Sequence, residues 1–474
     1  MINIEKIIQA SEGKTLEFKR DISSLKPIMK TLVAFVNTAG GILIIGREDD
    51  GTIRGVSDPL QVEERLSNAI SDSIAPAMMP EIEIFSIKGR QLILLKTAHW
   101  RGPFYLKSEG SENGVYIRLG STNRKAGPEI LAELNRSIVG VSFDQMPCGE
   151  TDENYLDLKQ VQAVFQSVNR SIGKEKLETL GLIVSYAGKK VLSNGGVILF
   201  AQEKYRNQYF PDARVSCARF RGTDKSEFID KLDIEGSILD AVESVPKFIM
   251  RNTRLYPKIE TFRREDIPAY SELAVREVLV NALSHTDYSL TGMRILVSIY
   301  SDRMEIQNPG MFPFGITLED FKAGVSKVRN RVIARVLREL GLMEEWGSGY
   351  RRIINSCKTG GYPEPEWIEQ GSVVRVIFYP HPEASEELIS NVPVNVPVNV
   401  PVNQRQQWFM NQVQKNAKVS AKEIAEHWKV SEKTAKRDIT DLKGKSVIAF
   451  SGAAKNGYYY LLKGSGGSGS DPDK

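Results

Sequence analysis

A proline repeat divides this chain into two parts of unequal size. Asn391 to Asn403 reads NVPVNVPVNVPVN. Each proline lacks a backbone N–H and fixes its φ angle, so the repeat forms neither a helix nor a central strand. We expect a semi-stiff tether over residues 386–403 that joins a large body to a small C-terminal module. The alternative is an edge strand that docks on the body.

The C-terminal module is strongly basic. Between Gln404 and Lys463, twelve lysines and arginines stand against five aspartates and glutamates, a net charge of +7 in a chain whose total is only +4. A compact basic module on a slightly acidic body indicates a nucleic-acid partner. The last residues, 464–474, read GSGGSGSDPDK, which is typical of an engineered linker rather than of a folded segment.

The rest of the composition is that of a globular protein. The chain has 474 residues, of which 41% are hydrophobic and 26% charged, which suits about three domains. It has no apolar run of about 18 residues and no secretory signal pattern at its start, so we expect no membrane partner. Three widely spaced cysteines, Cys148, Cys217 and Cys357, favour a reducing cytoplasm over a disulfide frame or a zinc site.

The basic module has the pattern of three helices followed by a hairpin. QRQQWFMNQVQK predicts the first helix, Ser420 with Glu423 forms a capping box for the second, and Ser431 caps the third. The strands SVIAF and GYYYLL follow, joined by a glycine-containing loop. Positions spaced to face inward form the expected core: Ile424, Ala425, Trp428, Val430, Ala435, Ile439 and Leu442.

This order of elements resembles the winged-helix family of transcription factors. The resemblance implies double-stranded DNA as the partner, with the front of the third helix and the wing as the contact surface. The residues expected to touch DNA are the polar ones of that surface: Lys433, Thr434, Lys436, Arg437, Lys445 and Lys455. The alternative is a winged helix that binds protein and merely exposes a solvated basic face.

A second polar pattern lies on an apolar helix predicted from Tyr270 to Leu283 and beyond. SELAVREVLVNALSHTDY places Glu277, Asn281 and His285 at i, i+4 and i+8, on one face. Polar groups on a face that should be buried need partners, and a ligand or metal ion can supply them. The spacing resembles the N-box of the Bergerat-fold ATPases. In that family the Asn contacts phosphate-bound Mg²⁺ and the Glu polarises the attacking water.

Two further segments follow in the order of that family. RMEIQNPG carries Asn308 and Gly310 where the family has its adenine-binding Asp-x-Gly loop, and EEWGSGYRRI carries Gly347 and Gly349 before a helix whose N–H groups would meet phosphate. Asn308 departs from the family, because an amide replaces a carboxylate.

Over residues 190–380 the strings are similar to the ATPase-type domain of RecG-like putative transcriptional regulators. The resemblance implies ATP and Mg²⁺ as cofactors. The departure at Asn308 leaves a structural domain without nucleotide as the alternative.

The N-terminal segment reads SEGKTLEFKRD and then AFVNTAGGILIIGREDDGT. It resembles the Schlafen-type AlbA-like domain over residues 8–130, which implies binding of nucleic acid, RNA included. In the Schlafen ribonucleases, matching carboxylates form a metal-dependent tRNA-cleaving site. Here those carboxylates would be Glu12, Glu17 and one of Glu48 or Asp49. The alternative is structural, with Glu17 paired to a lysine two residues on and EDDGT as an ordinary turn.

Taken as a whole, the chain is expected to be α/β (α+β) in class. Its expected domains are an AlbA-like domain at 1–140, a linker plus a Bergerat-type (GHKL-like) α/β sandwich at 150–385, and a winged helix at 404–463. GGVILF, from Gly195 to Phe200, is expected to be a buried strand. The expected function is a transcriptional regulator in which the state of the ATP site controls nucleic-acid binding, in a homo-oligomer of two or more copies. The alternatives are a metal-dependent nuclease in stress or anti-phage defence, and a scaffold that has kept its motifs without their chemistry.

Overall fold

The computed structural model describes residues 4–253, 255–260, 263–344, 347–385, 403–414, 419–444, 448–451 and 458–461. Contacts group the chain into two units, Met1–Ile389 and Ser390–Lys474, here called unit one and unit two. The expected tether, 386–403, lies outside the described residues except for Asn403, and so does the tail, 464–474.

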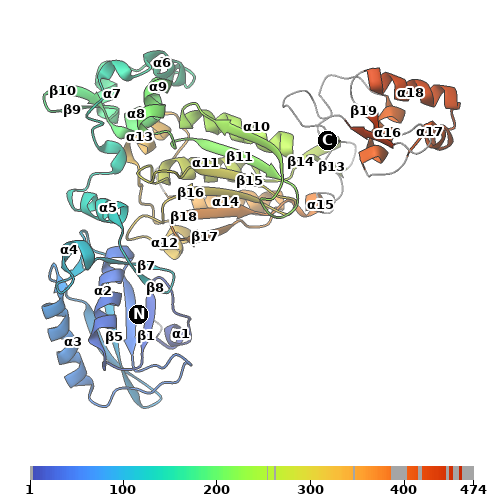
Figure 1. The fold of residues 1–474 in the computed structure, drawn as a ribbon. Coiled ribbons are helices and arrows are strands. Elements are labelled where there is room, and N and C mark those ends of the chain that lie inside the picture. Colours follow the sequence, from blue (N-terminus) through green and yellow to red (C-terminus); the bar gives the residue numbers. More distant parts are fainter. Residues whose placement is uncertain are drawn as a thin grey trace. The chain divides into compact units, whose positions relative to one another are not determined.

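Unit one begins with a four-stranded sheet in the order β1-β2-β5-β4 (Figure 1). Its strands are β1 (Leu16–Lys19), β2 (Gly41–Ile45), β4 (Glu81–Ile87) and β5 (Arg90–Thr97). The only parallel pair among them is β1 with β2. Side chains alternate between the two faces. Leu43 and Ile45 therefore pack with α2 (Leu25–Thr38) and α3 (Pro59–Ser73), while Ile44 packs with Phe18 near α1 (Ile4–Ile8).

Smaller elements close this N-terminal part. They are β3 (Ile74–Ala75), β6 (Tyr105–Leu106), α4 (Gly110–Asn113), β7 (Tyr116–Leu119), β8 (Thr122–Lys125) and α5 (Pro128–Val139). Asn37, buried on α2, fastens part of this region to the helix: its amide donates to the carbonyls of Phe104 and Tyr116, and its oxygen accepts from the Phe104 N–H. The Asn-Thr pair of the AFVNTAGG segment is thus structural, because the Thr38 hydroxyl accepts from the Arg118 N–H.

A mostly helical segment follows, from residue 143 to residue 209. Its elements are η1 (Phe143–Gln145), η2 (Glu153–Tyr155), α6 (Leu158–Gln166), α7 (Lys174–Leu180), β9 (Ile183–Tyr186), β10 (Lys189–Leu192), α8 (Asn194–Phe200) and α9 (Glu203–Tyr209).

The strand expected at Gly195 to Phe200 is wrong, because these residues form helix α8. Ser193 caps it by accepting from the Gly196 N–H, and all seven helical residues are buried. A short apolar run with no exposed side carries no periodicity that separates helix from strand.

The second half of unit one is a six-stranded sheet in the order β12-β11-β15-β16-β18-β17. The strands are β11 (Val215–Phe220), β12 (Phe228–Ile234), β15 (Ile295–Ile299), β16 (Met304–Pro309), β17 (Glu366–Gln370) and β18 (Val373–Phe378). Helices α10 (Ala241–Asn252), α11 (Glu272–His285), α13 (Arg331–Glu339) and α14 (Gly349–Gly360) share its buried core (Figure 1).

The remaining elements are η3 (Ile238–Asp240), β13 (Leu255–Glu260), β14 (Arg263–Pro268), α12 (Leu318–Ala323) and α15 (Pro382–Ser385). The expected α/β sandwich is confirmed. Its central helix, α11, begins two residues later than the sequence predicts, because Ser271 is its N-cap and accepts from the Ala274 N–H.

Unit two has the expected order of three helices and a hairpin. Its elements are α16 (Gln404–Gln414), α17 (Ala421–Trp428), α18 (Glu432–Gly444), β19 (Ile448–Ser451) and β20 (Tyr458–Leu461). The Ser420–Glu423 capping box is present. Ile424, Ala435, Ile439 and Leu442 are buried as expected.

The sequence did not indicate how α16 is fastened to α18. Asp438 is buried on α18 and accepts from the Arg405 guanidinium at 2.7 Å and from the Asn403 amide at 3.0 Å. Burial opposes ionisation of Asp438, but these hydrogen bonds outweigh it and lower its pKa. The contact holds the first helix against the third.

Candidate functional site

The first candidate site is a pocket beneath α11, called here the α11 pocket. It encloses about 1010 Å³ including its open mouth, a size that suits a nucleotide-sized ligand. The structure brings together at its wall the residues of all three sequence boxes: Glu277, Asn281, His285, Asn308, Gly347 and Gly349. Gly310 does not line it, but its φ of +100° turns the chain just beyond Asn308.

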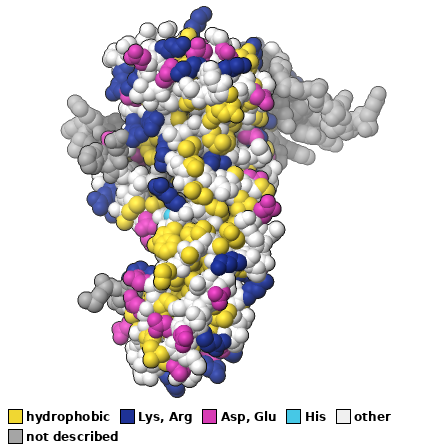
Figure 2. Space-filling model, turned by 90° about the vertical axis from the view of Figure 1, so that its left-hand side faces the viewer, with side chains coloured by type: hydrophobic (Ala, Val, Ile, Leu, Met, Phe, Trp, Pro, Cys, Tyr) yellow, Lys and Arg dark blue, Asp and Glu magenta, His cyan; other side chains and the backbone are white. Residues whose placement is uncertain are grey.

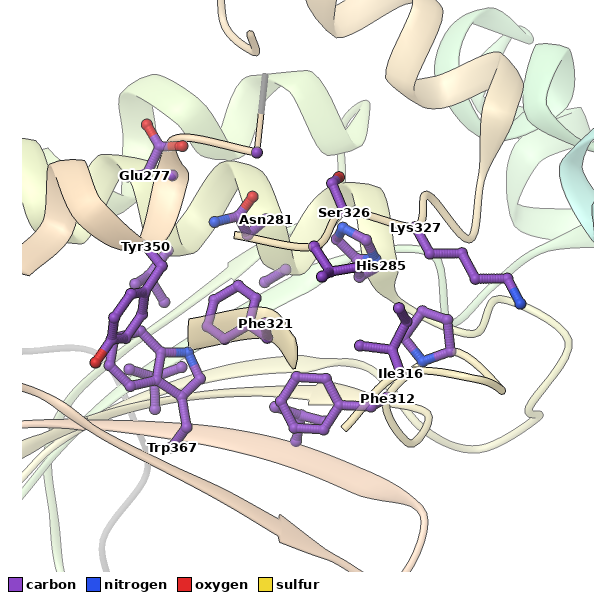
Figure 3. A pocket seen from close by; sticks show the side chains of 18 of the residues that line it. Glu277, Asn281, His285, Phe312, Ile316, Phe321, Ser326, Lys327, Tyr350 and Trp367 are labelled. Carbon is purple, nitrogen blue, oxygen red and sulfur yellow. The ribbon is translucent and has the colours of Figure 1, made fainter. Parts of the chain in front are cut away.

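Three polar side chains form one side of the α11 pocket. Glu277, Asn281 and His285 follow one another along α11, as their spacing predicts, and point into the cavity (Figure 3). Within the described chain, neither the Asn281 amide nor the His285 ring has a hydrogen-bond partner. Glu277 has one distant cation, the Arg352 guanidinium at 3.7 Å. Such groups on a half-buried face are positioned for a ligand rather than for the protein itself.

Burial changes the acidity of two of these groups. It raises the pKa of the Glu277 carboxyl, although Arg352 acts in the opposite direction. It lowers the pKa of His285 to about 4, with a further contribution from the charge of Arg329. At neutral pH His285 is therefore uncharged, and Glu277 is a stronger proton acceptor than an exposed carboxylate.

The glycines of the third box keep the end of α14 open. A Cβ atom on Gly349 would lie 2.8 Å from a Glu277 carboxylate oxygen and 3.5 Å from the Asn281 amide nitrogen. Gly347 has a φ of +63°, and a Cβ there would lie 2.3 Å from the Gly324 carbonyl oxygen. Any side chain at either position would fill the space beside the first turn of α14, where free N–H groups suit a phosphate.

An aromatic cluster forms the opposite side of the α11 pocket, and the sequence did not point to it. Phe321 lies with its ring centroid 5.9 Å from Phe312, 5.4 Å from Tyr350 and 5.7 Å from Trp367 (Figure 3). These residues come from four separate segments, so no local pattern could have revealed them. Their flat apolar surfaces suit a planar ring such as a nucleobase. Asn308, also buried in this wall, donates its amide hydrogen to the Pro309 carbonyl at 3.2 Å.

The floor of the α11 pocket is the segment around Phe312 and Pro313. The N-terminal part of unit one holds this segment in place. The Gly315 N–H donates to the Thr38 carbonyl at 2.6 Å. Lys14 pairs with Glu369 at 2.7 Å, and the same carboxylate accepts from the Phe312 N–H at 2.8 Å. A change in the position of Phe312 therefore reaches β17 and the segment just before β1.

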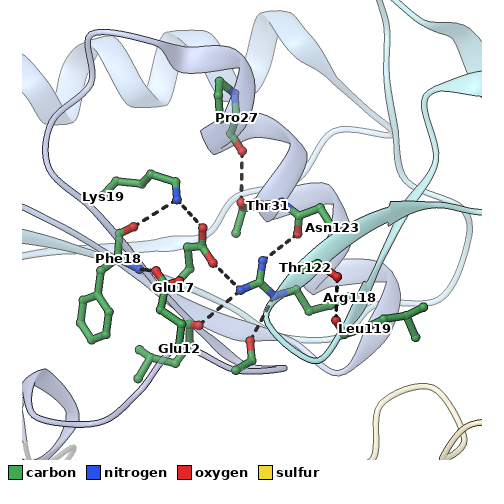
Figure 4. Close-up of polar contacts among 12 residues, drawn as sticks. Glu12, Glu17, Phe18, Lys19, Pro27, Thr31, Arg118, Leu119, Thr122 and Asn123 are labelled. Atoms are coloured by element: carbon green, nitrogen blue, oxygen red, sulfur yellow. Dashed lines mark hydrogen bonds and ion pairs between the residues drawn. The ribbon is translucent and has the colours of Figure 1, made fainter. Parts of the chain in front are cut away.

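The carboxylates proposed for a nuclease site, Glu12, Glu17 and one of Glu48 or Asp49, each have surroundings of their own in the structure. Glu17 is buried and bonded on one side to Lys19 and on the other to the fully buried Arg118 (Figure 4). Glu12 accepts from the Phe18 N–H at 2.9 Å, and Glu48 pairs with Arg54 at 3.0 Å.

Asp49 is exposed in the turn that follows β2. No group of three metal-ligating side chains occurs among the residues the structure describes. In this structure Glu17 holds β1 to β7, and nothing gathers the other carboxylates around it.

The surface expected to bind DNA is exposed on unit two. Lys433, Lys436 and Arg437 project from the first half of α18, and of these three only Lys436 forms an ion pair within the described residues, with Glu432 at 3.6 Å. Thr434 faces inward more than expected, with its hydroxyl 3.0 Å from that of Ser431, the N-cap of this helix. Lys445 and Lys455 lie outside the described residues.

No helix within the described ranges combines the length and apolarity needed to cross a membrane. The three cysteines are unpaired, and burial raises the pKa of Cys217 to about 12.

Comparison with known families divides the chain as its motifs do. Residues 12–127 match the family described as Schlafen, AlbA_2, residues 292–378 match Putative ATP-dependent DNA helicase recG C-terminal, and residues 405–452 match the DeoR-like helix-turn-helix domain. These matches confirm the three resemblances seen in the sequence. The second one begins after α11, so it covers Asn308 and the glycine box but not Glu277, Asn281 or His285.

Two solved structures are also similar to this chain. The DIP2311 protein from Corynebacterium diphtheriae aligns over 97% of this chain and 98% of its own, with 17% identity and a TM-score of 0.41. The N-terminal domain of a putative ATP-dependent DNA helicase RecG-related protein from Nitrosomonas europaea aligns over 27% and 95%, with 25% identity and a TM-score of 0.22. Both scores are too low to add an argument. No curated protein matches the chain.

Proposed function

We propose that this protein is a DNA-binding transcriptional regulator whose α11 pocket binds ATP with Mg²⁺. The observation that carries the proposal is the convergence of three sequence-distant boxes on one pocket, with polar groups on one side and aromatic rings on the other. The ATPase-like match over residues 292–378 and the helix-turn-helix match over residues 405–452 support the two binding activities. The protein would act in the cytoplasm as a homo-oligomer, since winged helices commonly read paired half-sites.

The residues present fit a magnesium nucleotide. The Asn281 amide oxygen, free of partners within the described chain, would hold the metal ion, since Mg²⁺ prefers oxygen ligands. The first turn of α14, kept open by Gly347 and Gly349, would take phosphate oxygens. Phe321 and Trp367 would hold the base, with Asn308 at its edge. When bound, Mg²⁺ would offset the negative charge of the phosphates.

Glu277 has the properties of a proton acceptor for a water molecule at the phosphate end. Burial raises the pKa of this carboxyl towards neutral pH, and a base transfers protons most effectively when its pKa lies near the working pH. Arg352 lies 3.7 Å from the Glu277 carboxylate, and the missing side chain of Gly349 leaves room beside its oxygens. If the protein hydrolyses ATP, Glu277 is the residue we assign as base. If it only binds ATP, Glu277 still orients the water around the phosphates.

Control of nucleic-acid binding would begin at the floor of the α11 pocket. A nucleotide bound against Phe312 would touch the segment that is held by Glu369, itself paired with Lys14, and by the Thr38 carbonyl. That contact connects the nucleotide state with the AlbA-like part, and the winged helix follows on the same chain.

Titration calorimetry of the full chain with a non-hydrolysable ATP analogue and Mg²⁺ tests the proposal. The unaltered protein should bind the analogue, and Asn281→Ala should abolish binding without changing the unfolding curve, since the amide has no partner to lose. Asn411→Ala, an exposed amide on α16, is the matched control and should bind normally. If the unaltered protein shows no heat at millimolar analogue, the domain is structural and the proposal fails.

A further inference from the structure

A second pocket, called here the basic pocket, lies on the other side of the segment that forms the floor of the α11 pocket. Its volume is about 810 Å³ including its mouth. It is bounded by α5, by residues around His99 and by the start of α13, and it shares only Pro313 and Lys327 with the α11 pocket. The face of the molecule drawn in Figure 2 carries apolar side chains together with basic and acidic ones.

Cations outnumber anions in the basic pocket. Five of its lining residues are cationic: Arg101, Arg136, Lys327, Arg329 and Arg331. The two carboxylates that line it, Glu133 and Asp287, are both paired with Arg329. The other four cations have no acidic partner within ion-pair distance among the described residues. The pocket therefore holds positive charge that the chain itself does not neutralise.

Two of these arginines converge on one point. The Arg331 guanidinium donates to the Gly140 carbonyl at 2.6 Å, and Arg101 would lie 4.0 Å from a Cβ atom placed on Gly140. Lys327 reaches in from the floor that the two pockets share. Asp144 already accepts from the first three N–H groups of α13, at 2.7 to 3.1 Å, so any ligand here must use the side chains.

The positive charge of the basic pocket affects the pKa values of two groups that line it. Burial lowers the pKa of Lys327, and the nearby Arg101 lowers it further. Burial also lowers the pKa of His99 to about 4, with Lys327 and Arg101 as additional causes. An anion among these groups would relieve the repulsion between them.

We propose that the basic pocket is a phosphate-binding site, separate from the α11 pocket. Arginine guanidinium groups match phosphate oxygens with paired N–H donors, and a partly enclosed cavity strengthens such contacts. The phosphate belongs either to nucleic acid held by the AlbA-like part or to a small nucleotide. Pro313 and Lys327 line both pockets, so a ligand bound in one pocket should change the affinity of the other for its ligand. This inference does not depend on ATP binding in the α11 pocket.

Calorimetry of the full chain with inorganic pyrophosphate, without Mg²⁺, tests the site. Pyrophosphate has no base to bind the aromatic cluster, and the absence of metal removes the role of Asn281. Binding should weaken at least tenfold in Arg101→Glu and in Arg331→Gln, and Asn281→Ala should leave it unchanged. Lys159→Glu, an exposed lysine on α6, is the control for altered charge. Arg101 is exposed and unpaired, so its variant should fold normally.

Competition then identifies the source of the phosphate. The competitors are added to the Asn281→Ala variant with pyrophosphate bound. Displacement by a 5′-phosphorylated single-stranded oligonucleotide assigns the site to nucleic acid. Displacement only by a mononucleotide assigns it to a small ligand. The proposal is overturned if the unaltered protein does not bind pyrophosphate, or if Arg101→Glu and Arg331→Gln bind it as tightly. Loss of binding in Asn281→Ala would also overturn it, because the phosphate would then lie in the α11 pocket.

Discussion

The carboxylates near β1 and the polar residues of α11 were both expected to be chemical sites, and the structure treats them differently. The Glu17 carboxylate accepts hydrogen bonds from Lys19 and from the buried Arg118. Glu277, Asn281 and His285 face a cavity, and among the described residues only Glu277 forms an ion pair, with Arg352 at 3.7 Å. A polar group already bonded within the chain stabilises the fold, whereas one left without partners beside a cavity is available to a ligand.

The largest expected effect is on stability, at Glu17. Glu17→Ala should lower the free energy of unfolding by about 3–5 kcal/mol, because it leaves the Arg118 guanidinium buried without its countercharge. Chemical unfolding of both proteins measures the difference. Glu12→Ala is the comparison, since the exposed Glu12 holds a single backbone N–H, and it should cost far less. If the unaltered protein cleaves RNA with a divalent metal ion, and a stably folded Glu17→Ala variant does not, the nuclease interpretation holds instead.

Glu277 sharpens the comparison from the opposite side. Glu277→Gln should unfold at nearly the same denaturant concentration as the unaltered protein, because Arg352 keeps its second partner, Glu344, at 3.0 Å. Any ATP hydrolysis should fall by roughly 10²–10⁴-fold, the usual cost of losing a positioned base. A turnover assay beside analogue binding separates the two effects. Loss of stability without loss of turnover would make Glu277 structural, like Glu17.

Acid should weaken the fold through the histidines. His99 and His285 have pKa values of about 4 in the fold and about 6.5 when unfolded, so the unfolded chain takes up their protons first. Their contribution is complete above pH 6.5 and is lost as the pH falls towards 4. At pH 5 the stability lost amounts to about 2 kcal/mol for each histidine. Urea unfolding at pH 7 and pH 5 measures this, and His285→Gln should show a smaller decrease. An equal decrease in that variant would show that His285 is not the cause.

The smallest expected effect concerns the exposed cations of α18, which have no structural duty to lose. Lys436→Glu with Arg437→Glu should weaken duplex binding by tenfold or more and reduce its salt dependence, since fewer counterions are released. Lys422→Glu is a matched control, because Lys422, like Lys436, pairs with a glutamate four residues away on an exposed helix face. Equal effects of Lys422→Glu and Lys436→Glu on binding would place the DNA elsewhere.

Much of the secondary structure can be predicted from interactions between residues close in the sequence. Capping at Ser420, the apolar spacing of α11 and the hairpin after α18 depend on neighbours within a few residues, so the sequence alone predicts them. The helix at Asn194–Phe200 was mistaken for a strand because it is buried on every side. Only packing against its neighbours decides its conformation.

For the candidate site, the sequence by itself determined that Glu277, Asn281 and His285 share a face, because helical periodicity fixes which residues align. It could not determine the aromatic cluster around Phe321, the contact of Lys14 with Glu369, or the basic pocket. Each of these joins segments far apart in the chain, and only the tertiary structure brings them together. The same holds for Glu17: its residue type suggested chemistry, and the buried Arg118, 101 positions later, made it a structural ion pair. Burial and partner choice are properties of the whole fold, and they decide which polar residues remain free to act.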